Sequence, residues 1–157
     1  MKKTADQWFA EYGECHHNSV NEVIHWICIP AIMLSVLGLL WSIPMPASWG
    51  SVADYVNIAT LLLVGSLVFY FRLSPPLAAG MLAIAVLFLA LIIGYGRTAW
   101  PPVWSVALGV FVLAWILQFV GHKIEGKKPA FFQDLQFLLI GPLWLLGFIY
   151  RRVGIPY

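Results

Sequence analysis

Residues 77–95 read LAAGMLAIAVLFLALIIGY, and no charged side chain interrupts this run. At about 1.5 Å of rise per residue, a helix of this length crosses most or all of a hydrocarbon core roughly 30 Å thick. Comparable apolar runs cover residues 26–43, 56–71 and 103–120. The sequence therefore predicts an all-α membrane protein with about four transmembrane helices, folded as a single domain over residues 1–157.

The composition excludes an ordinary soluble globule. Of the 157 residues, 61% are hydrophobic and 10% are charged, whereas a soluble domain carries about 25% charged residues. The net charge of +2 is small and scattered, so nothing favours nucleic acid as a partner. Cys15 and Cys28 stand in such different settings that we expect two free thiols rather than a disulfide.

A short interfacial helix is predicted at the N-terminus. Residues 4–7 read Thr-Ala-Asp-Gln, which is the pattern of a helix-starting capping box. A helix that begins there places Trp8, Phe9 and Tyr12 along one side, as helices that lie at a membrane surface do.

The C-terminal apolar stretch, residues 131–150, differs from the other runs. It carries three polar residues early and a Gly-Pro pair in its middle: Gln133, Asp134, Gln136 and Gly141-Pro142. We interpret it as a bent, interfacial or re-entrant segment, and a fifth crossing is the alternative.

The basic residues predict the orientation in the membrane. With four crossings, one face receives the N-terminus, the loop at residues 72–76 and the chain after residue 120. That face collects Lys2, Lys3, Arg72, Lys123, Lys127 and Lys128, with Arg151 and Arg152 added if residues 131–150 turn back. The opposite face has Arg97 alone. Basic loops stay in the cytoplasm, so we expect the N-terminus on the cytoplasmic side. The short chain suits a bacterial cytoplasmic membrane, which is our expectation for its location.

Two short polar clusters contain every histidine of the chain. Residues 12–25 read YGECHHNSVNEVIH and residues 118–125 read QFVGHKIE. The four histidines are His16, His17, His25 and His122. An even number of crossings returns the chain to the same face, so both clusters are expected to meet there. Ionisable residues at the membrane edge are costly and usually mark function.

The local pattern around the first cluster predicts a break in the helix. Residues 19–22 read Ser-Val-Asn-Glu, a second capping box, which would start the first membrane helix at that point. His16 and His17 would then lie in a turn, where both can fold back over the site. Asn21 and His25 would be neighbours one helical turn apart.

The second cluster repeats this one-turn spacing. Gln118 and His122 are four residues apart on a predicted helix, and Glu125 follows. Gly121 beside His122 permits the close approach of another helix.

These residues suit a metal site with an open position. Neutral imidazole binds Fe, Zn, Cu or Ni, and three or four imidazoles with an open coordination position are typical of a catalytic centre. Asn21 and Glu125 lie nearby, and Gln118 and Asn18 could hold ring nitrogens or water. Residues alone leave a second interpretation equally open, in which the histidines only cap helices or lie at the interface.

The motifs resemble a known family. The spacing Tyr-x3-His-His-Asn-x2-Asn-x3-His over residues 12–25, followed by Ile29-Pro30, resembles its N-terminal signature. Residues 115–122, followed by Glu125, a basic pair and Pro129-Ala130, resemble its second signature. The family consists of small multipass membrane proteins, typified by the yeast 2-hydroxy fatty acid dioxygenase of phytosphingosine breakdown.

The resemblance implies Fe(II)-dependent α-oxidation, in which a 2-hydroxy fatty acid reacts with O2 and becomes a fatty acid one carbon shorter. It also implies His16, His17, His25 and His122 as the positions that hold iron. Glu125 and Asn21 are the expected catalytic helpers, in proton handling or in contact with the iron ligands. The acyl tail would lie among the helices, in contact with membrane lipid.

Three alternatives remain. The first is a desaturase or hydroxylase, but the sites of those enzymes contain many more histidines than the four found here. A haem-binding electron carrier would want histidines within facing crossings. A non-enzymatic scaffold or lipid-binding protein would use the histidines only as helix caps.

Overall fold

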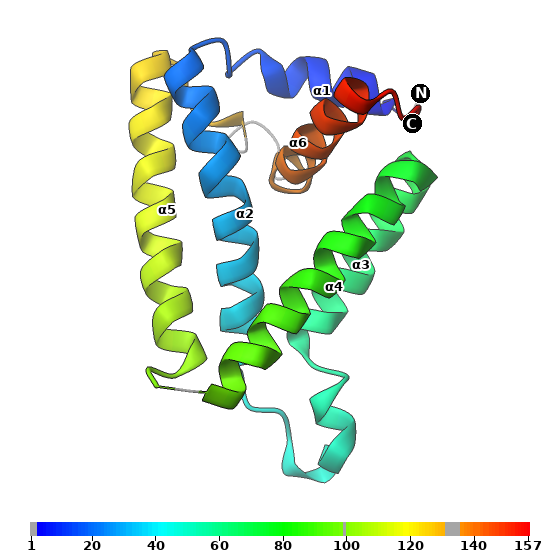
Figure 1. The fold of residues 1–157 in the computed structure, drawn as a ribbon, viewed down its shortest axis with the longest axis vertical. Helices are drawn as coiled ribbons and strands as arrows, with labels where there is room; N and C mark the ends of the chain where they lie inside the picture. The colour runs from blue at the N-terminus through cyan, green and yellow to red at the C-terminus, as the bar shows by residue number, and fades with distance from the viewer. Residues whose placement is uncertain (1–2, 99, 131–135) are drawn as a thin grey trace.

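Every regular element in the part of the chain that the structure describes is a helix. The computed structural model describes residues 3–98, 100–130 and 136–157 (Figure 1). Its elements are α1 (Ala5–Gly13), α2 (Ser19–Trp41), the 3-10 helix η1 (Ala47–Asp54), α3 (Ile58–Leu73), α4 (Pro75–Thr98), α5 (Val103–Glu125) and α6 (Phe137–Val153). The predicted all-α fold is confirmed.

Three of the described helices, α2, α4 and α5, are long and apolar enough to cross a membrane. Helix α3 has 16 residues, or about 24 Å at 1.5 Å per residue, which falls short of a roughly 30 Å core. It reaches spanning length only together with the short helix before it, from which it is bent by 55°. The predicted count of about four crossings therefore corresponds to three spans, or four if this bent pair acts as one.

Helices α2 and α5 lie side by side and run in opposite directions (Figure 1). Small residues allow this close approach near both ends of the pair. A Cβ atom on Gly38 would meet Ala107 of α5 at 3.1 Å, and one on Gly121 would overlap the Oδ1 atom of Asn21 in α2. Lipid gives helices no hydrophobic reason to associate, so close packing at small residues takes that role. The predicted approach of another helix at Gly121 is confirmed.

Helices α3 and α4 form a tilted hairpin that crosses the far end of α2 (Figure 1). A buried cluster of Leu37, Ala59, Phe88 and Ile92 joins these three helices. Because α2, α3, α4 and α5 alternate in direction, the start of α2 and the end of α5 lie at the same end of the molecule (Figure 1). The topology therefore brings both histidine clusters to that end.

Helix α1 begins as predicted and packs on α6. The capping box is present, because Thr4 and Gln7 exchange side chain to backbone hydrogen bonds. Trp8 meets Phe137 edge to face, with ring centroids 5.3 Å apart. Phe9 covers Gly147 so closely that a Cβ atom there would overlap its ring. The aromatic side predicted for α1 is thus the side that α6 buries.

Helix α6 is continuous through Gly141-Pro142, where the sequence predicted a bend. Pro142 stands inside the helix without ending it. The early polar residues Gln133 and Asp134 lie outside the described residues. Figure 1 shows α6 beside α1, at the end of the molecule that carries both termini. It is not among the described helices that qualify as spans, and its relation to the bilayer stays a prediction.

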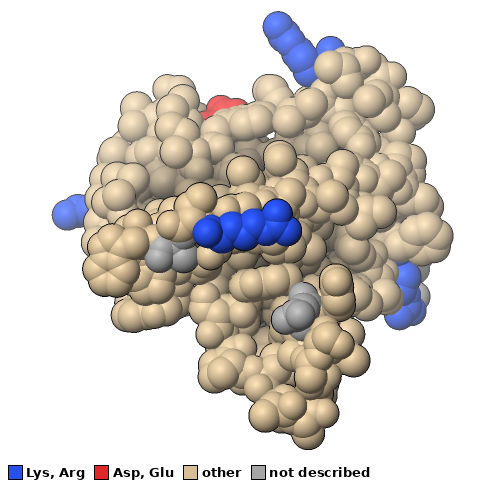
Figure 2. Space-filling model, turned by 60° about the horizontal axis from the view of Figure 1, so that its bottom comes forward, with Lys and Arg blue, Asp and Glu red and all other residues tan. Residues whose placement is uncertain are grey.

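The two ends of the molecule differ in charge. Exposed basic residues at the histidine end are Lys3, Arg72, Lys123, Lys127, Lys128, Arg151 and Arg152. The loops at the opposite end, residues 42–57 and 96–102, contain Arg97 alone among their lysines and arginines. Figure 2 brings that opposite end forward, and uncharged atoms dominate the surface it shows.

Candidate metal centre

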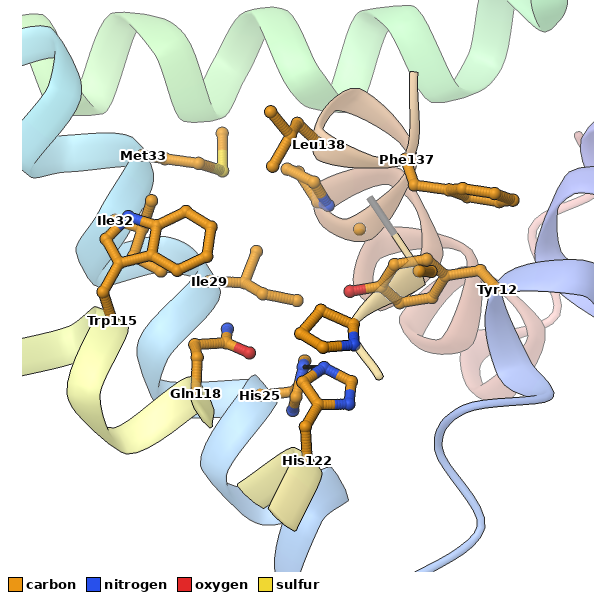
Figure 3. Close-up of a pocket in the computed structure, with 14 residues that line it drawn as sticks. Tyr12, His25, Ile29, Ile32, Met33, Trp115, Gln118, His122, Phe137 and Leu138 are labelled. Carbon is orange, nitrogen blue, oxygen red and sulfur yellow. Dashed lines mark hydrogen bonds between the residues drawn. The ribbon is translucent and has the colours of Figure 1, made fainter. Parts of the chain in front are cut away.

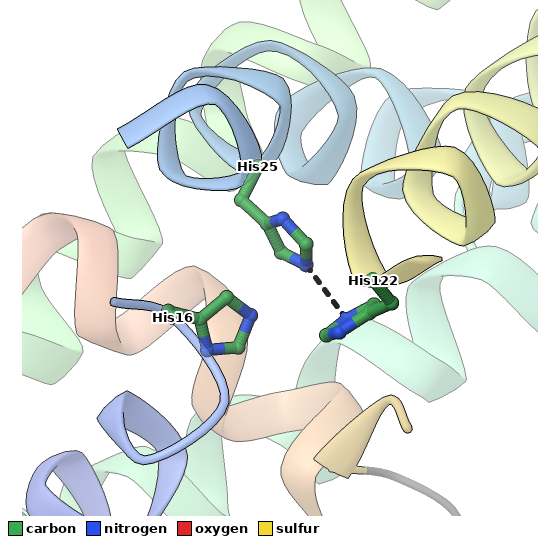
Figure 4. Close-up of side chains that lie close together, drawn as sticks. All are labelled: His16, His25 and His122. Atoms are coloured by element: carbon green, nitrogen blue, oxygen red, sulfur yellow. Dashed lines mark hydrogen bonds between the residues drawn. The ribbon is translucent and has the colours of Figure 1, made fainter. Parts of the chain in front are cut away.

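Three histidines from three separate segments meet at one point (Figure 4). His16 comes from the turn between α1 and α2, His25 from the second turn of α2, and His122 from the last turn of α5. Their exposed fractions are 6%, 1% and 5%, and the ring nitrogens that face one another all lie within 4.8 Å. This spacing is small enough for one ion to contact all three rings.

Backbone carbonyls fix the orientation of two of these rings. The Nδ1 atom of His16 lies 2.7 Å from the carbonyl oxygen of Tyr12, and Nδ1 of His25 lies 2.8 Å from that of Asn21. A carbonyl only accepts a hydrogen bond, so each Nδ1 carries the proton and each Nε2 keeps its lone pair. Metal-binding histidines are commonly held in this manner by a second hydrogen bond.

Two ring nitrogens of the cluster have no partner in the described chain. His16 Nε2 and His122 Nδ1 are buried without a hydrogen-bond partner among the described residues, and Nε2 of His25 lies 3.1 Å from Nε2 of His122. Buried nitrogens without partners cost free energy, which a bound ion would recover. Burial also lowers the pKa of His16 and so favours the neutral imidazole that metals bind.

His17 lies outside this cluster, in contrast to the prediction that both adjacent histidines fold back over the site. Its side chain is exposed, and its backbone N–H donates to the Oε1 atom of Glu125 at 3.0 Å. In the turn between α1 and α2, His16 and His17 point in different directions, so only one of the two rings reaches the site.

Glu125 acts as a brace between α5 and the start of α2. Its carboxylate accepts hydrogen bonds from the backbone N–H groups of His17 and Asn18, at 3.0 and 2.8 Å, and from the side chain of Asn21 at 3.1 Å. It is not part of the three-histidine group. These contacts hold the start of α2 and the turn before it in place, and the predicted role of Glu125 in proton handling stays a prediction.

Asn21 links the brace to the histidines. Its side-chain amide donates to Glu125 and to the carbonyl of Cys15 at 3.1 Å, and its own carbonyl holds the His25 ring. The residue is fully buried. Asn21 therefore positions both the turn that carries His16 and the helix that carries His25.

Helix α2 starts one residue earlier than the predicted capping box implied. The N-cap is Asn18, whose Oδ1 atom accepts from the backbone N–H of Val20 at 2.9 Å and of Asn21 at 3.4 Å. Asparagine caps helices at least as well as serine, so Ser19 becomes the first helical residue. The break between α1 and α2 is nevertheless where the sequence predicted it.

A cavity of about 70 Å³ lies beside His25 and His122 (Figure 3). Its walls are mostly apolar and come from α2, α5 and α6, with Ile29, Met33 and Leu138 among them. A second cavity, of about 220 Å³, is lined by apolar side chains of α2, α4 and α6. The two cavities share Ile29, Met33 and Pro142 in their walls, so they adjoin.

Sequence reasoning missed the contribution of α6 to this cavity. Phe137, Leu138 and Gly141 line it, and a Cβ atom on Gly141 would press on the hydroxyl of Tyr12 at 2.8 Å. The Gly141-Pro142 pair was the available signal, because a glycine inside an apolar helix marks a close approach. Gln118, which the sequence predicted to lie next to His122, does line the cavity beside that histidine.

Fold and site together define a helical membrane protein with a buried three-histidine cluster at one end. The family model described as "2-hydroxy-palmitic acid dioxygenase Mpo1-like" matches residues 2–153. The chain is also 32% identical over 145 residues to the 2-hydroxy-palmitic acid dioxygenase MPO1 of Saccharomyces cerevisiae. The matched region covers 91% of this chain and 78% of the yeast protein. The chain belongs to the Mpo1-like family. No solved structure matches it, and its bacterial origin stays a prediction from the sequence.

Proposed function

We propose that this protein is an Fe(II)-dependent dioxygenase that shortens 2-hydroxy fatty acids by one carbon. The observation that carries the proposal is the convergence of three buried imidazoles beside an apolar cavity, in a member of the Mpo1-like family. The activity in the yeast relative's name, 2-hydroxy-palmitic acid dioxygenase, supplies the substrate class.

His16, His25 and His122 would hold the iron. Their chemistry fits, since they offer neutral nitrogen donors within reach of one ion and some of these nitrogens lack any described partner. Three protein ligands leave coordination positions open, which a catalytic site requires. When bound, iron would supply the redox chemistry that allows O2 to react with an organic acid.

The overall reaction balances with O2 as the sole oxidant. The bond between the carboxyl carbon and the carbon that carries the hydroxyl breaks, and that second carbon becomes the new carboxyl group. A 2-hydroxy acid and one O2 give the shorter acid, one CO2 and one water. The substrate loses four electrons and O2 takes up four, so no further reductant is needed.

The residues of this chain would bind the substrate and keep water out. The polar head of a fatty acid would lie in the smaller cavity beside His25 and His122, and the adjoining larger cavity has apolar walls suited to its tail. Asn21, Glu125 and the two backbone carbonyls would hold the rings in place while substrate and product exchange.

The site end is proposed to face the cytoplasm, because the exposed lysines and arginines gather there. A cysteine introduced at Lys127 should resist a membrane-impermeant thiol reagent in intact cells, and one introduced at Ser48 should react. The reverse labelling pattern would contradict this orientation.

Metal removal and return tests the proposed function. The detergent-purified protein is stripped with a chelator, then supplied with Fe(II), Mn(II) or Zn(II), and given 2-hydroxypalmitate in air. We expect pentadecanoic acid with Fe(II) and little or none without it. An absorption spectrum distinguishes a haem protein, and a protein that binds no metal and forms no product would favour the scaffold interpretation.

A further inference from the structure

Two polar side chains reach into the smaller cavity without a partner. Tyr12 and Gln118 line it, and their exposed fractions are 7% and 6%. The Tyr12 hydroxyl and the Gln118 amide make no hydrogen bond with a described residue, and both residues line the cavity. Figure 3 shows both polar ends turned toward the space between α2, α5 and α6. We refer to Tyr12 and Gln118 as the polar pair.

A buried polar group without a partner is unfavourable, and proteins normally avoid it. Tyr70 shows the ordinary arrangement in this chain, because it is 3% exposed and its hydroxyl donates to the carbonyl of Leu139 at 3.0 Å. The polar pair departs from this arrangement at the wall of a cavity. A ligand that supplies hydrogen bonds would explain why these groups are present in a mostly apolar wall.

The polar pair has a regular relation to the histidines. Tyr12 lies four residues before His16, and Gln118 lies four residues before His122. In α5 this spacing puts Gln118 and His122 on the same face. His16 lies beyond the end of α1, and its ring stacks on that of Tyr12 with the ring centroids 4.4 Å apart. The polar pair therefore approaches the cavity from two walls, α1 and α5, each beside a residue of the three-histidine cluster.

The chemistry of the two side chains suits one class of ligand in particular. A tyrosine hydroxyl donates one hydrogen bond, and a glutamine amide offers two donors and one acceptor. A carboxylate with a hydroxyl on the adjacent carbon matches this set, since the carboxylate accepts from the donors and the hydroxyl donates to the Oε1 atom of Gln118. A fatty acid without the 2-hydroxyl would leave that oxygen buried and unpaired.

The cavity has the size of a head group. A volume of about 70 Å³ exceeds the roughly 10–15 Å³ that one water needs, and it is far too small for a long acyl chain. The tail would continue past Ile29, Met33 and Pro142 into the larger cavity.

We propose that Tyr12 and Gln118 form the recognition site for the 2-hydroxycarboxylate head of the substrate and distinguish it from an ordinary fatty acid. This inference rests on the proposed function and adds specificity-determining residues to it. A site built to bond a substrate hydroxyl discriminates strongly against the analogue that lacks it, because its own polar group is then left unpaired.

The test compares binding of 2-hydroxypalmitate and palmitate under nitrogen, followed by tryptophan fluorescence, in Gln118→Met and Tyr12→Phe. Both variants keep the shape of the side chain and remove its hydrogen-bonding group. We expect the preference for the 2-hydroxy acid to fall about tenfold in Gln118→Met, because this is the effect of losing about one hydrogen bond. In turnover of 2-hydroxypalmitate by Gln118→Met, KM should rise about tenfold while kcat and iron content change little.

Matched controls separate this effect from general damage. Leu117→Met alters the exposed neighbour of Gln118, and Tyr70→Phe removes a buried hydroxyl elsewhere; both should keep the full preference. If Gln118→Met fails to fold, Gln118→Asn draws the amide back by one methylene and serves in its place.

The outcomes are distinguishable from those for the proposed function. An unchanged preference in Gln118→Met would overturn this inference. Undiminished binding of both acids in Tyr12→Phe would overturn it too, because the Tyr12 hydroxyl is assigned to the carboxylate that both acids carry. A wild-type protein that turns over no 2-hydroxy acid would defeat the proposed function, and the binding preference would still test the polar pair.

Discussion

At the scale of single residues, the site depends on a repeated spacing of four. Each histidine of the cluster follows a polar residue by four positions: Tyr12 with His16, Asn21 with His25 and Gln118 with His122. In two of these pairs, the earlier residue's carbonyl fixes the histidine ring. The third pair places an amide in the cavity wall. The spacing therefore links each clustered histidine to a residue that orients its ring or lines the adjoining cavity.

Removal of a clustered histidine should abolish stoichiometric iron binding. We expect His25→Ala and His122→Ala to lose iron and activity while the helix content stays near that of the wild type. His17→Ala is the matched control, since its side chain is exposed outside the cluster, and it should retain both. Iron analysis after gel filtration measures the difference, and wild-type iron content in either cluster variant would contradict the shared centre.

A methyl group at Gly121 should disturb the contact between α2 and α5. The Cβ atom of Gly121→Ala would overlap the Oδ1 atom of Asn21, and overpacking of this kind costs about 1–3 kcal/mol. We expect a lower Tm in detergent and weaker iron binding. Gly109→Ala lies on the same helix, where a Cβ atom meets nothing within 4 Å. An equal fall in Tm for Gly109→Ala would show that the effect is not specific to this contact.

At the scale of elements, the break between α1 and α2 creates the site. The break places His16 in a turn, and the carboxylate of Glu125 ties that turn to the end of α5 through the backbone of His17 and Asn18. Lys127 adds a second tie through its hydrogen bond to the carbonyl of Glu14. A single continuous helix over residues 5–41 would offer no such turn.

Loss of the brace should weaken iron binding without removing a ligand. Residues that orient metal ligands typically contribute about 10–100-fold in metal affinity, so we expect a decrease of that order in Glu125→Ala. Glu125→Gln keeps one acceptor oxygen, and its iron affinity should lie between those of the wild type and Glu125→Ala. Titration of Fe(II) under nitrogen measures the affinity.

Glu22→Ala, in the first turn of α2, is the control for removal of one negative charge. If Glu125→Ala kept full iron affinity and lost only kcat, the brace interpretation would be wrong. Glu125 would then act in proton handling, as the sequence predicted.

At the scale of the whole molecule, the membrane helices and the orientation could be predicted from the sequence, because the bilayer constrains the length of apolar runs and the placement of basic loops. The parity of the crossings was enough to bring residues 12–25 and 118–125 together. The features that could not be predicted from the sequence depend on tertiary contacts. The direction of His16 against His17 is set by one turn, and the entry of α6 into the cavity wall depends on packing between distant segments.

The arrangement of the two cavities predicts control of chain length. Ile84 of α4 lines the larger cavity, so Ile84→Trp should fill part of it and shift the preference from 2-hydroxypalmitate to 2-hydroxylaurate. Ile93→Trp, on a more exposed part of the same helix, is the control. Competition between the two acids, with products separated by mass, measures the shift. An unchanged preference in Ile84→Trp would place the acyl tail elsewhere.

The most direct test of the account is the fate of labelled oxygen in a single turnover. The protein is loaded with Fe(II) under nitrogen, mixed with 2-hydroxypalmitate, exposed to ¹⁸O2 and analysed by mass spectrometry. We expect pentadecanoic acid with one ¹⁸O atom in its carboxyl group, formed only when iron is bound. An unlabelled acid, an aldehyde as the final product, or the same yield from iron-free protein would contradict it.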